Sequence, residues 1–135
     1  MRTSARYKST KSIVLVDNTS EIALRRIWPV FGLRLETPRL QLAALTDDDL
    51  PELHELARGG IHDPCEMPFP NGWTERPEEE AASGFARYFW QQRARWTPDS
   101  WALPFVVRRD GEAVGVQQLT ADHFPVLRVA GTGSW

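Results

Sequence analysis

The chain has 135 residues, of which 41% are hydrophobic, and its formal net charge is −2. This length suits one domain with one core, and no apolar run reaches the roughly eighteen residues of a membrane span, so we expect no membrane association. Cys65 is the single cysteine, which excludes an intrachain disulfide and favours a reducing, cytoplasmic location.

The first 27 residues differ in charge from the rest of the chain. They carry six Lys or Arg against two acids, whereas the remainder carries ten against sixteen. We predict a flexible basic extension over residues 1–27 and a folded domain over residues 28–135. A transit peptide is a weaker alternative, and the apolar run from Ile13 to Val16 is too short for a secretory signal. Translation from an upstream start codon would also account for these residues.

The folded pattern begins near Leu33, where apolar and polar residues alternate on both sides of a break at Thr37 and Pro38. This alternation predicts an extended segment in two pieces. A first helix is predicted over residues 50–57, where leucines recur at helical spacing before a pair of glycines. Pro51 is tolerated only in a first helical turn, which favours Asp48 over Thr46 as the capping residue.

The next segment, "GIHDPCEMPFPNGW", contains three prolines and two glycines, which predicts a loop. Thr74 is the expected cap of a longer helix that ends at Thr97 and Pro98. Aromatic residues recur along one side of this helix, and we interpret them as core.

A β-hairpin follows, with strands over residues 101–107 and 114–119 joined by a turn at Asp110 and Gly111. Pro104 within the first strand indicates an edge position or a bulge. A third strand is expected from Phe124 or Val126 to the chain end. Two helices after the first strand and then an antiparallel sheet make an α+β fold.

This order of elements resembles the GNAT family, the GCN5-related N-acetyltransferases, and is similar to its ribosomal-protein-alanine acetyltransferase branch. The segments that carry the resemblance are "LRLETPRLQLAALTDDDLPEL", "GIHDPCEMPF", "FVVRRDGEAVGVQQL" and "GTGSW", within residues 33–135. The resemblance implies transfer of an acetyl group from acetyl-CoA to a primary amine, either a protein N-terminus or a small molecule.

The final residues, "RVAGTGSW", match R-x-x-G-x-G, which in that family binds the coenzyme pyrophosphate. A phosphate site of this kind needs a helix start directly after the glycines, and only Ser134 and Trp135 follow Gly133. By element order the segment is instead similar to the central strand that precedes the coenzyme loop. We therefore expect a partial GNAT domain, truncated in this strand before the CoA-binding loop and helix, and possible inactivity of the chain for that reason.

The resemblance also implies which residues form the site. Backbone N–H groups of Thr132, Gly133, Ser134 and Trp135 would meet the thioester. The loop between the two helices would border the acceptor, which makes His62, Asp63 and Glu66 the candidates for the base that deprotonates the amine. The favoured alternative is that Asp63 and Pro64 start a turn and that His62 is a surface residue.

Met67, Phe69 and Gln117 are candidates for binding the acceptor. Anchoring of the loop in the core is the more common role of residues such as Met67 and Phe69, and a solvated strand face is the default for Gln117. Since Gln117 and Gln118 lie on opposite faces of a strand, only one of them can face a ligand.

Other classes of function find little support in the sequence. The three histidines and Cys65 lack zinc-ligand spacing, so no metal is expected. The acidic balance of residues 28–135 disfavours nucleic acid. A different class remains as the alternative to an enzyme: a non-catalytic remnant or interaction domain that pairs an open sheet edge with another chain, including a homodimer.

Overall fold

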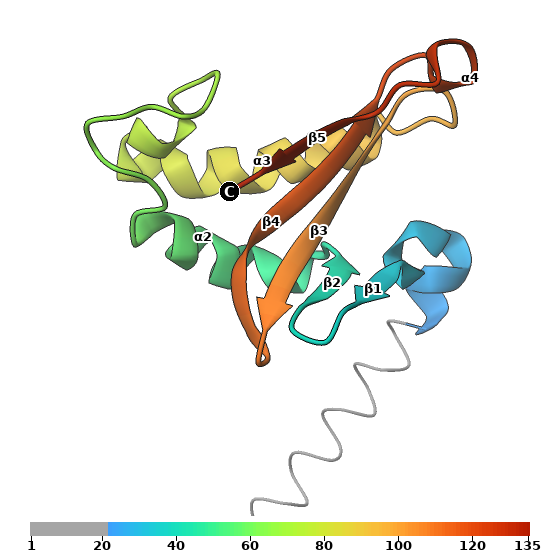
Figure 1. Ribbon diagram of the computed structural model, residues 1–135. Coiled ribbons are helices and arrows are strands. Elements are labelled where there is room, and N and C mark those ends of the chain that lie inside the picture. Colours follow the sequence, from blue (N-terminus) through green and yellow to red (C-terminus); the bar gives the residue numbers. More distant parts are fainter. Residues whose placement is uncertain (1–21) are drawn as a thin grey trace, which may run out of the picture. The chain divides into compact units, whose positions relative to one another are not determined.

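A computed structural model describes residues 22–135 (Figure 1). The expected flexible extension falls mostly on residues 1–21, which lie outside the described range. The chain divides into two compact units between Leu33 and Arg34. In the first unit, residues 22–27 are helical, the N–H of Trp28 donates to the carbonyl of Leu24 at 2.8 Å, and a short 3-10 helix, η1 (Pro29–Gly32), follows.

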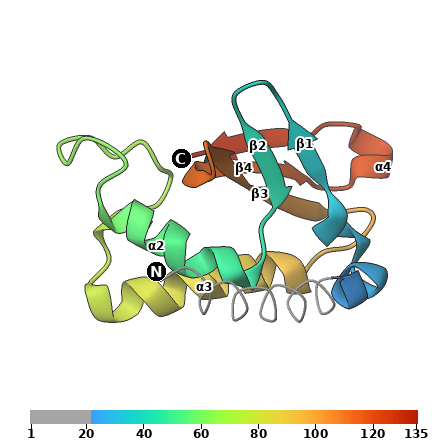
Figure 2. The same ribbon diagram turned by 90° about the horizontal axis from the view of Figure 1, so that it is seen from below.

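The second unit is a five-stranded antiparallel sheet with two helices on one face (Figures 1 and 2). The strand order in space follows the order in the chain. This arrangement confirms the predicted α+β fold. The strands are β1 (Arg34–Glu36), β2 (Gln41–Ala44), β3 (Trp101–Arg109), β4 (Glu112–Ala121) and β5 (Gly131–Ser134), and the helices are α2 (Leu50–Arg58) and α3 (Glu78–Ala94).

The two-piece extended segment forms the β1–β2 hairpin. Thr37 makes the turn, since its N–H donates to the carbonyl of Leu40 at 2.8 Å and its hydroxyl oxygen accepts the N–H of Leu40 at 2.9 Å. This geometry is typical of a threonine hydroxyl that closes a short turn. The break predicted at Thr37 and Pro38 is confirmed.

The start of the first helix differs from the prediction. A single 3-10 turn, η2 (Asp47–Asp49), precedes α2, and Thr46 rather than Asp48 is the capping residue. The carboxylate of Asp49 accepts both the N–H of Thr46 at 2.8 Å and its hydroxyl at 3.0 Å. Pro51 correctly predicted where α2 begins. Because the 3-10 turn η2 precedes this helix, the capping residue is Thr46, three residues before Asp49.

Thr74 does not cap the second helix, contrary to expectation. It lies in a separate 3-10 turn, η3 (Trp73–Glu75), and α3 starts after Pro77. The carbonyl of Pro77 accepts the N–H groups of Glu80 and Ala81, each at 2.9 Å. Pro77 is the residue that precedes the first helical residue, a place where its missing N–H removes no bond from the helix. The hydroxyl of Thr74 therefore makes no capping hydrogen bond to α3.

The β3–β4 hairpin is confirmed, with Asp110 at φ 52° and Gly111 at φ 89°, the positive values that a two-residue type I′ turn needs. Pro104 is not on an edge strand, because β3 lies between β2 and β4. The carbonyl of Pro104 accepts the N–H of Leu45 at 2.9 Å. The nitrogen of Pro104 points to the same side of β3, past Ala44, which is the last residue of β2 that pairs with β3. The bulge lies farther on, between Val107 and Arg108.

The third strand is shorter than predicted. Residues Phe124–Leu127 form a helical turn, α4, between His123 and Arg128, which both have positive φ, and β5 begins only at Gly131. Pro125 suits the first turn of a helix, and the N–H of Phe124 donates to the carbonyl of Asp99 at 2.8 Å. The helical turn and its bond to Asp99 override the strand tendency of the valines.

The core lies between the sheet and the two helices. Leu45, Leu53 and Val106 are almost fully buried there. The remaining buried members of the cluster are Leu50, Phe85, Phe89 and Val116. Phe85 and Phe89 on the aromatic side of α3 thus belong to the core, as predicted, whereas Tyr88 on the same side is exposed, contrary to the prediction. Within residues 22–135, no helix is long and apolar enough to cross a membrane.

Candidate functional site

The loop between α2 and α3 positions His62 through both of its ring nitrogens. Nδ1 lies 2.8 Å from the carbonyl oxygen of Asp63, and Nε2 lies 2.9 Å from the hydroxyl oxygen of Thr74. The ring also meets Phe69 edge-on, with centroids 5.6 Å apart. His62 and Thr74 are both half-buried. The histidine is therefore held in one orientation, which a free surface residue would not be.

Asp63 forms the turn that its position before Pro64 predicted. Its carboxylate accepts the N–H of Cys65 at 2.8 Å, and its carbonyl accepts the N–H of Glu66 at 3.0 Å. Asp63 and Glu66 are both exposed. The structure thus assigns the Asp63 carboxylate a bonding role within the loop and leaves Glu66 at the surface.

Aromatic rings connect this loop to the end of β5. Phe69 contacts Trp73 at 5.3 Å between ring centroids, and Trp73 contacts Trp135 at 5.6 Å. Trp73 and Trp135 also pack against the core cluster, beside Phe85. Phe69 therefore anchors the loop, while Met67 is 38% exposed with its sulfur 4.0 Å from the Thr74 hydroxyl.

Within residues 22–135, the backbone of β5 pairs on one side, with β4. Trp135 exchanges both backbone hydrogen bonds with Val116, at 2.9 and 3.1 Å. Because backbone groups alternate in direction along an antiparallel strand, Gly133 also faces β4, and the N–H groups of Thr132 and Ser134 point to the open edge. A Cβ placed on Gly133 would meet nothing within 4 Å, so there is free space beside the strand.

The two glutamines of β4 point to opposite faces, as the sequence predicted. Gln118 lies on the helix face and accepts the hydroxyl of Tyr88 at 3.1 Å. Gln117 lies on the other face, opposite Ser134, and its amide donates to the carbonyl of Gly133 at 3.1 Å. Gln117 is thus the glutamine that adjoins β5.

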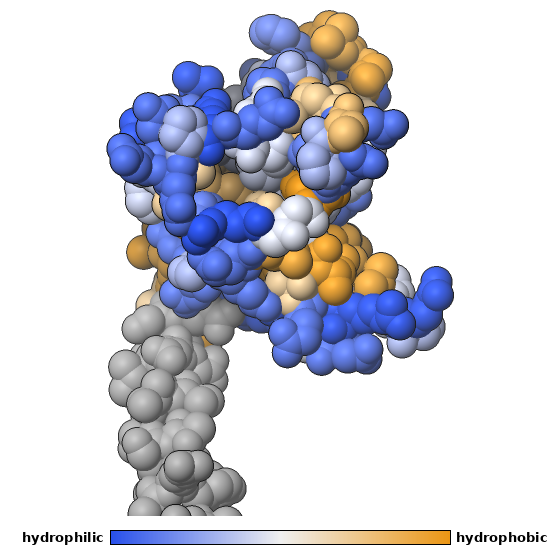
Figure 3. Space-filling view, turned by 90° about the vertical axis from the view of Figure 1, so that its left-hand side faces the viewer, coloured by the Kyte–Doolittle hydropathy of each residue, from blue (hydrophilic) through white to orange (hydrophobic). Residues whose placement is uncertain are grey.

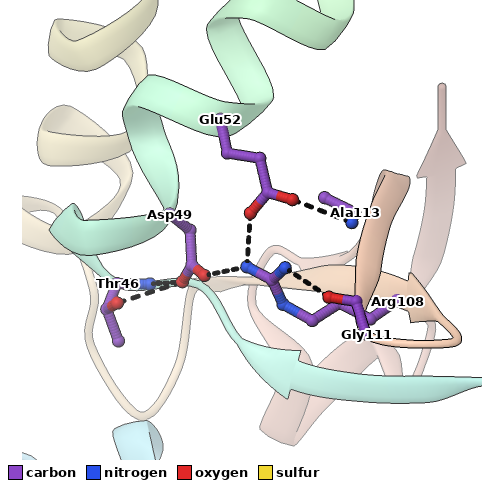
Figure 4. A network of polar contacts seen from close by, with 6 residues as sticks. All are labelled: Thr46, Asp49, Glu52, Arg108, Gly111 and Ala113. Carbon is purple, nitrogen blue, oxygen red and sulfur yellow. Dashed lines mark hydrogen bonds and ion pairs between the residues drawn. The ribbon is translucent and has the colours of Figure 1, made fainter. Parts of the chain in front are cut away.

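A second polar cluster, which sequence reasoning missed, joins α2 to the β3–β4 hairpin (Figure 4). The guanidinium of Arg108 contacts Asp49 at 2.9 Å and Glu52 at 2.8 Å, and it donates to the carbonyl of Gly111 at 3.2 Å. The other oxygen of Glu52 accepts the N–H of Ala113 at 3.0 Å. No sequence spacing signals the bonds from Arg108 to Asp49 and from Ala113 to Glu52, since they link residues about sixty positions apart.

The charges in this cluster are mutually stabilising. The hydrogen bond from Arg108 lowers the pKa of Glu52, and the bond from Ala113 lowers it further. The same bond to Glu52 raises the pKa of Arg108. Since every partner in this cluster belongs to the protein itself, we assign the cluster a structural role.

Acidic residues surround the α2–α3 loop. Residues 59–80 contain six carboxylates and one arginine. On the side of the molecule that Figure 3 shows, hydrophilic residues predominate, with apolar surface between them. A cationic amine would be attracted to the carboxylates of residues 59–80. Among residues 22–135, no group of three or more His, Cys, Asp or Glu is arranged to hold a metal ion.

Comparison with known proteins identifies the architecture. No protein-family model matches the chain. Three solved structures resemble it: RimL, a ribosomal L7/L12 alpha-N-protein acetyltransferase, with coenzyme A bound; the same enzyme in its apo form; and a putative ribosomal-protein-serine acetyltransferase from Vibrio cholerae. Their TM-scores are 0.51, 0.51 and 0.53, at 18%, 18% and 19% sequence identity.

The chain has a GNAT-like fold. The matches cover 76–78% of this chain and 52–55% of the solved ones. The chain therefore spans about half the length of the acetyltransferases that it matches. At 18–19% sequence identity, the likeness shows the fold alone.

Proposed function

We propose that this protein transfers the acetyl group of acetyl-CoA to a primary amine, with the N-terminal amine of a protein as the acceptor. The observation that carries the proposal is the GNAT-like sheet and helix layer, in which the open edge of β5 and the α2–α3 loop are connected by ring contacts. The neighbours are acetyltransferases of ribosomal proteins by name, which favours a protein acceptor over a small molecule. We include a cytoplasmic location in the proposal, since the chain has one cysteine.

The β5 edge suits the donor side of such a reaction. The outward N–H groups of Thr132 and Ser134 are hydrogen-bond donors at a strand edge, and Gly133 places no side chain between them. Acetyl-CoA would supply a thioester, whose carbonyl oxygen gains negative charge as the amine attacks. Backbone N–H groups directed at that oxygen would stabilise the charge. Gln117 is placed to hold the same part of the strand.

The α2–α3 loop suits the acceptor side. Met67 and Phe69 provide apolar contact for a first residue, and the exposed carboxylates of the loop favour a cationic amine. The amine must lose a proton before it attacks, and His62 is the candidate base in this loop, because both of its ring nitrogens are held by hydrogen bonds.

Acetyl transfer is tested with the full-length protein, acetyl-CoA and a synthetic peptide with a free N-terminal serine. We expect the peptide to gain one acetyl group by mass spectrometry, with release of one equivalent of CoA thiol. The same peptide with a blocked N-terminus is the matched control and should not change. Thiol release without peptide modification, or modification of neither peptide, would contradict the proposal.

A second candidate is a non-catalytic interaction domain, an alternative in which the chain is inactive. The observation that favours it is the one-sided pairing of β5, whose residues 131–134 are all exposed. An unpaired edge can accept a strand from another chain. Such pairing would use the same N–H groups that the first candidate assigns to the thioester, so the two functions compete for one edge.

A further inference from the structure

The contacts of His62 determine which of its nitrogens is basic. The partner of Nδ1 is the carbonyl oxygen of Asp63, which can only accept a hydrogen bond. Nδ1 must therefore carry the proton. In a neutral imidazole the other nitrogen is then an acceptor, so the lone pair of Nε2 faces the hydroxyl of Thr74 at 2.9 Å.

Thr74 can serve both protonation states of this ring. When His62 is neutral, the Thr74 hydroxyl donates to Nε2. When Nε2 carries a proton, the bond reverses, and the hydroxyl can turn toward the sulfur of Met67, a weak acceptor 4.0 Å away. Thr74 is free for this role because Pro77, rather than Thr74, precedes α3.

We propose that Thr74 and His62 form a proton relay for the acceptor amine, an inference that rests on the proposed acetyl transfer. The ammonium of the acceptor gives a proton to Oγ1 of Thr74 while the hydroxyl proton of Thr74 passes to Nε2 of His62. The neutral amine then forms the new C–N bond as the C–S bond of the thioester breaks, the thiolate leaves with the electron pair, and the thiolate takes the second proton from the nitrogen of the new amide. His62 returns the first proton through Thr74 to solvent.

The position of the pair is consistent with this role. His62 contacts Phe69, and Phe69 begins the series of rings that reaches Trp135 beside β5. An acceptor lying along these rings would present its amine to the exposed side of Thr74. Thr74 would touch the substrate directly, whereas His62 acts through it.

The tautomer is the first test, and it requires no activity. Long-range proton–nitrogen NMR of the full-length protein should show His62 protonated at Nδ1 at pH 8, with the signal identified by its loss in His62→Gln. Thr74→Val should alter the Nε2 shift, and Thr74→Ser should restore it. Protonation at Nε2 instead would overturn the relay.

Kinetics provide the second test, with acetyl-CoA and the free N-terminal serine peptide. Thr74→Val should lower kcat by about a hundredfold at pH 7, the lower end of the range of general acid–base catalysis, and Thr74→Ser should recover most of it. Thr97→Val is the matched control, because it also removes a hydroxyl that bonds only within its own turn. The control should retain the wild-type rate.

The pH profile separates a relay from a structural role. A peptide α-amine is largely neutral above about pH 9, where it needs no base, so the deficit of Thr74→Val should shrink there. The charged or titratable neighbours in the loop and η3 are Asp63, Cys65, Glu66, Glu75 and Arg76. A Cys65→Ser background removes the thiol from the comparison.

The outcomes are distinguishable. A deficit that is equal at pH 7 and pH 9.5, or a wild-type rate in Thr74→Val, overturns the relay and leaves acetyl transfer intact. A wild-type protein that transfers no acetyl group overturns the proposed function and the relay together.

Discussion

Individual residues in this fold act through contacts that their neighbours in sequence do not reveal. Gly115 is the clearest example. It has φ 156° and lies beside the bulge of the hairpin, where an added Cβ would overlap the carbonyl oxygen of Trp135. The glycine is thus required by the close approach of β5 to β4.

Gly115→Ala should destabilise the protein by about 1–3 kcal/mol, because the new methyl group must displace Trp135 and its two backbone bonds to Val116. The measurement is the free energy of unfolding in urea, with tryptophan fluorescence as the probe. Gly133→Ala is the matched control, since a Cβ there meets nothing within 4 Å. Equal stability of the two variants would contradict the steric argument.

The candidate site was only partly predictable at this scale. The loop composition correctly predicted the turn at Asp63, and His62 stays a predicted site residue. The role of Thr74 was misassigned, because a threonine before a run of glutamates is typical of a helix cap. Its true partner is twelve residues away, and only the folded loop brings the two side chains together.

At the scale of elements, polar contacts fix α2 against the β3–β4 hairpin. Arg108 holds two carboxylates of the helix start, and Glu52 in turn accepts the N–H of Ala113. These bonds favour the charged form of Glu52 and lower its pKa from the ordinary value of 4.5. A lowered pKa in the folded state stabilises the protein above the unfolded value, and this stability is lost as the pH falls through the folded value.

Glu52→Gln should therefore reduce the fall in the free energy of unfolding that occurs at acidic pH. Above pH 4.5 the wild type should be the more stable protein, and the difference should shrink as the pH falls further. Urea unfolding at pH 6.5 and at a series of values below 4.5 measures this difference. Glu112→Gln, at an exposed position in the same hairpin, is the control and should follow the wild-type profile. A difference that stays constant with pH would refute the linkage.

The hairpin itself was predictable, while its surroundings were not. Alternating residues and the Asp110–Gly111 pair determine β3, β4 and their turn locally. Pro104 can lie in the central strand β3 because the pairing of β2 with β3 ends at Phe105, and the extent of this pairing is set by the tertiary structure. The turn at Phe124–Leu127 depended on a bond to Asp99, which lies in the connection before β3.

At the scale of the whole molecule, the free edge of the sheet distinguishes the two candidate functions. Thr132 and Ser134 direct their N–H groups outward, away from β4. A bound coenzyme and a second chain cannot occupy these groups together. The oligomeric state with and without acetyl-CoA therefore reports which candidate is correct.

The interaction-domain candidate predicts a dimer by light scattering coupled to size-exclusion chromatography. Thr132→Pro should give a monomer, because it removes an outward N–H while keeping the bonds to β4. Thr120→Val, on β4, is the control and should keep the wild-type mass. A wild-type monomer at all concentrations would count against edge pairing, and a dimer that dissociates when acetyl-CoA is added would show that both use one edge.

The sequence by itself determined the α+β class, the two helices, the central hairpin and the loop that holds His62, because hydrophobic periodicity and turn residues act over a few positions. The tertiary structure decided the pairing of Thr74 with His62, the Arg108 cluster and the extent of β5. Each of these depends on a contact between groups whose partners the chain brings together only on folding, and such contacts leave no periodic trace in the sequence.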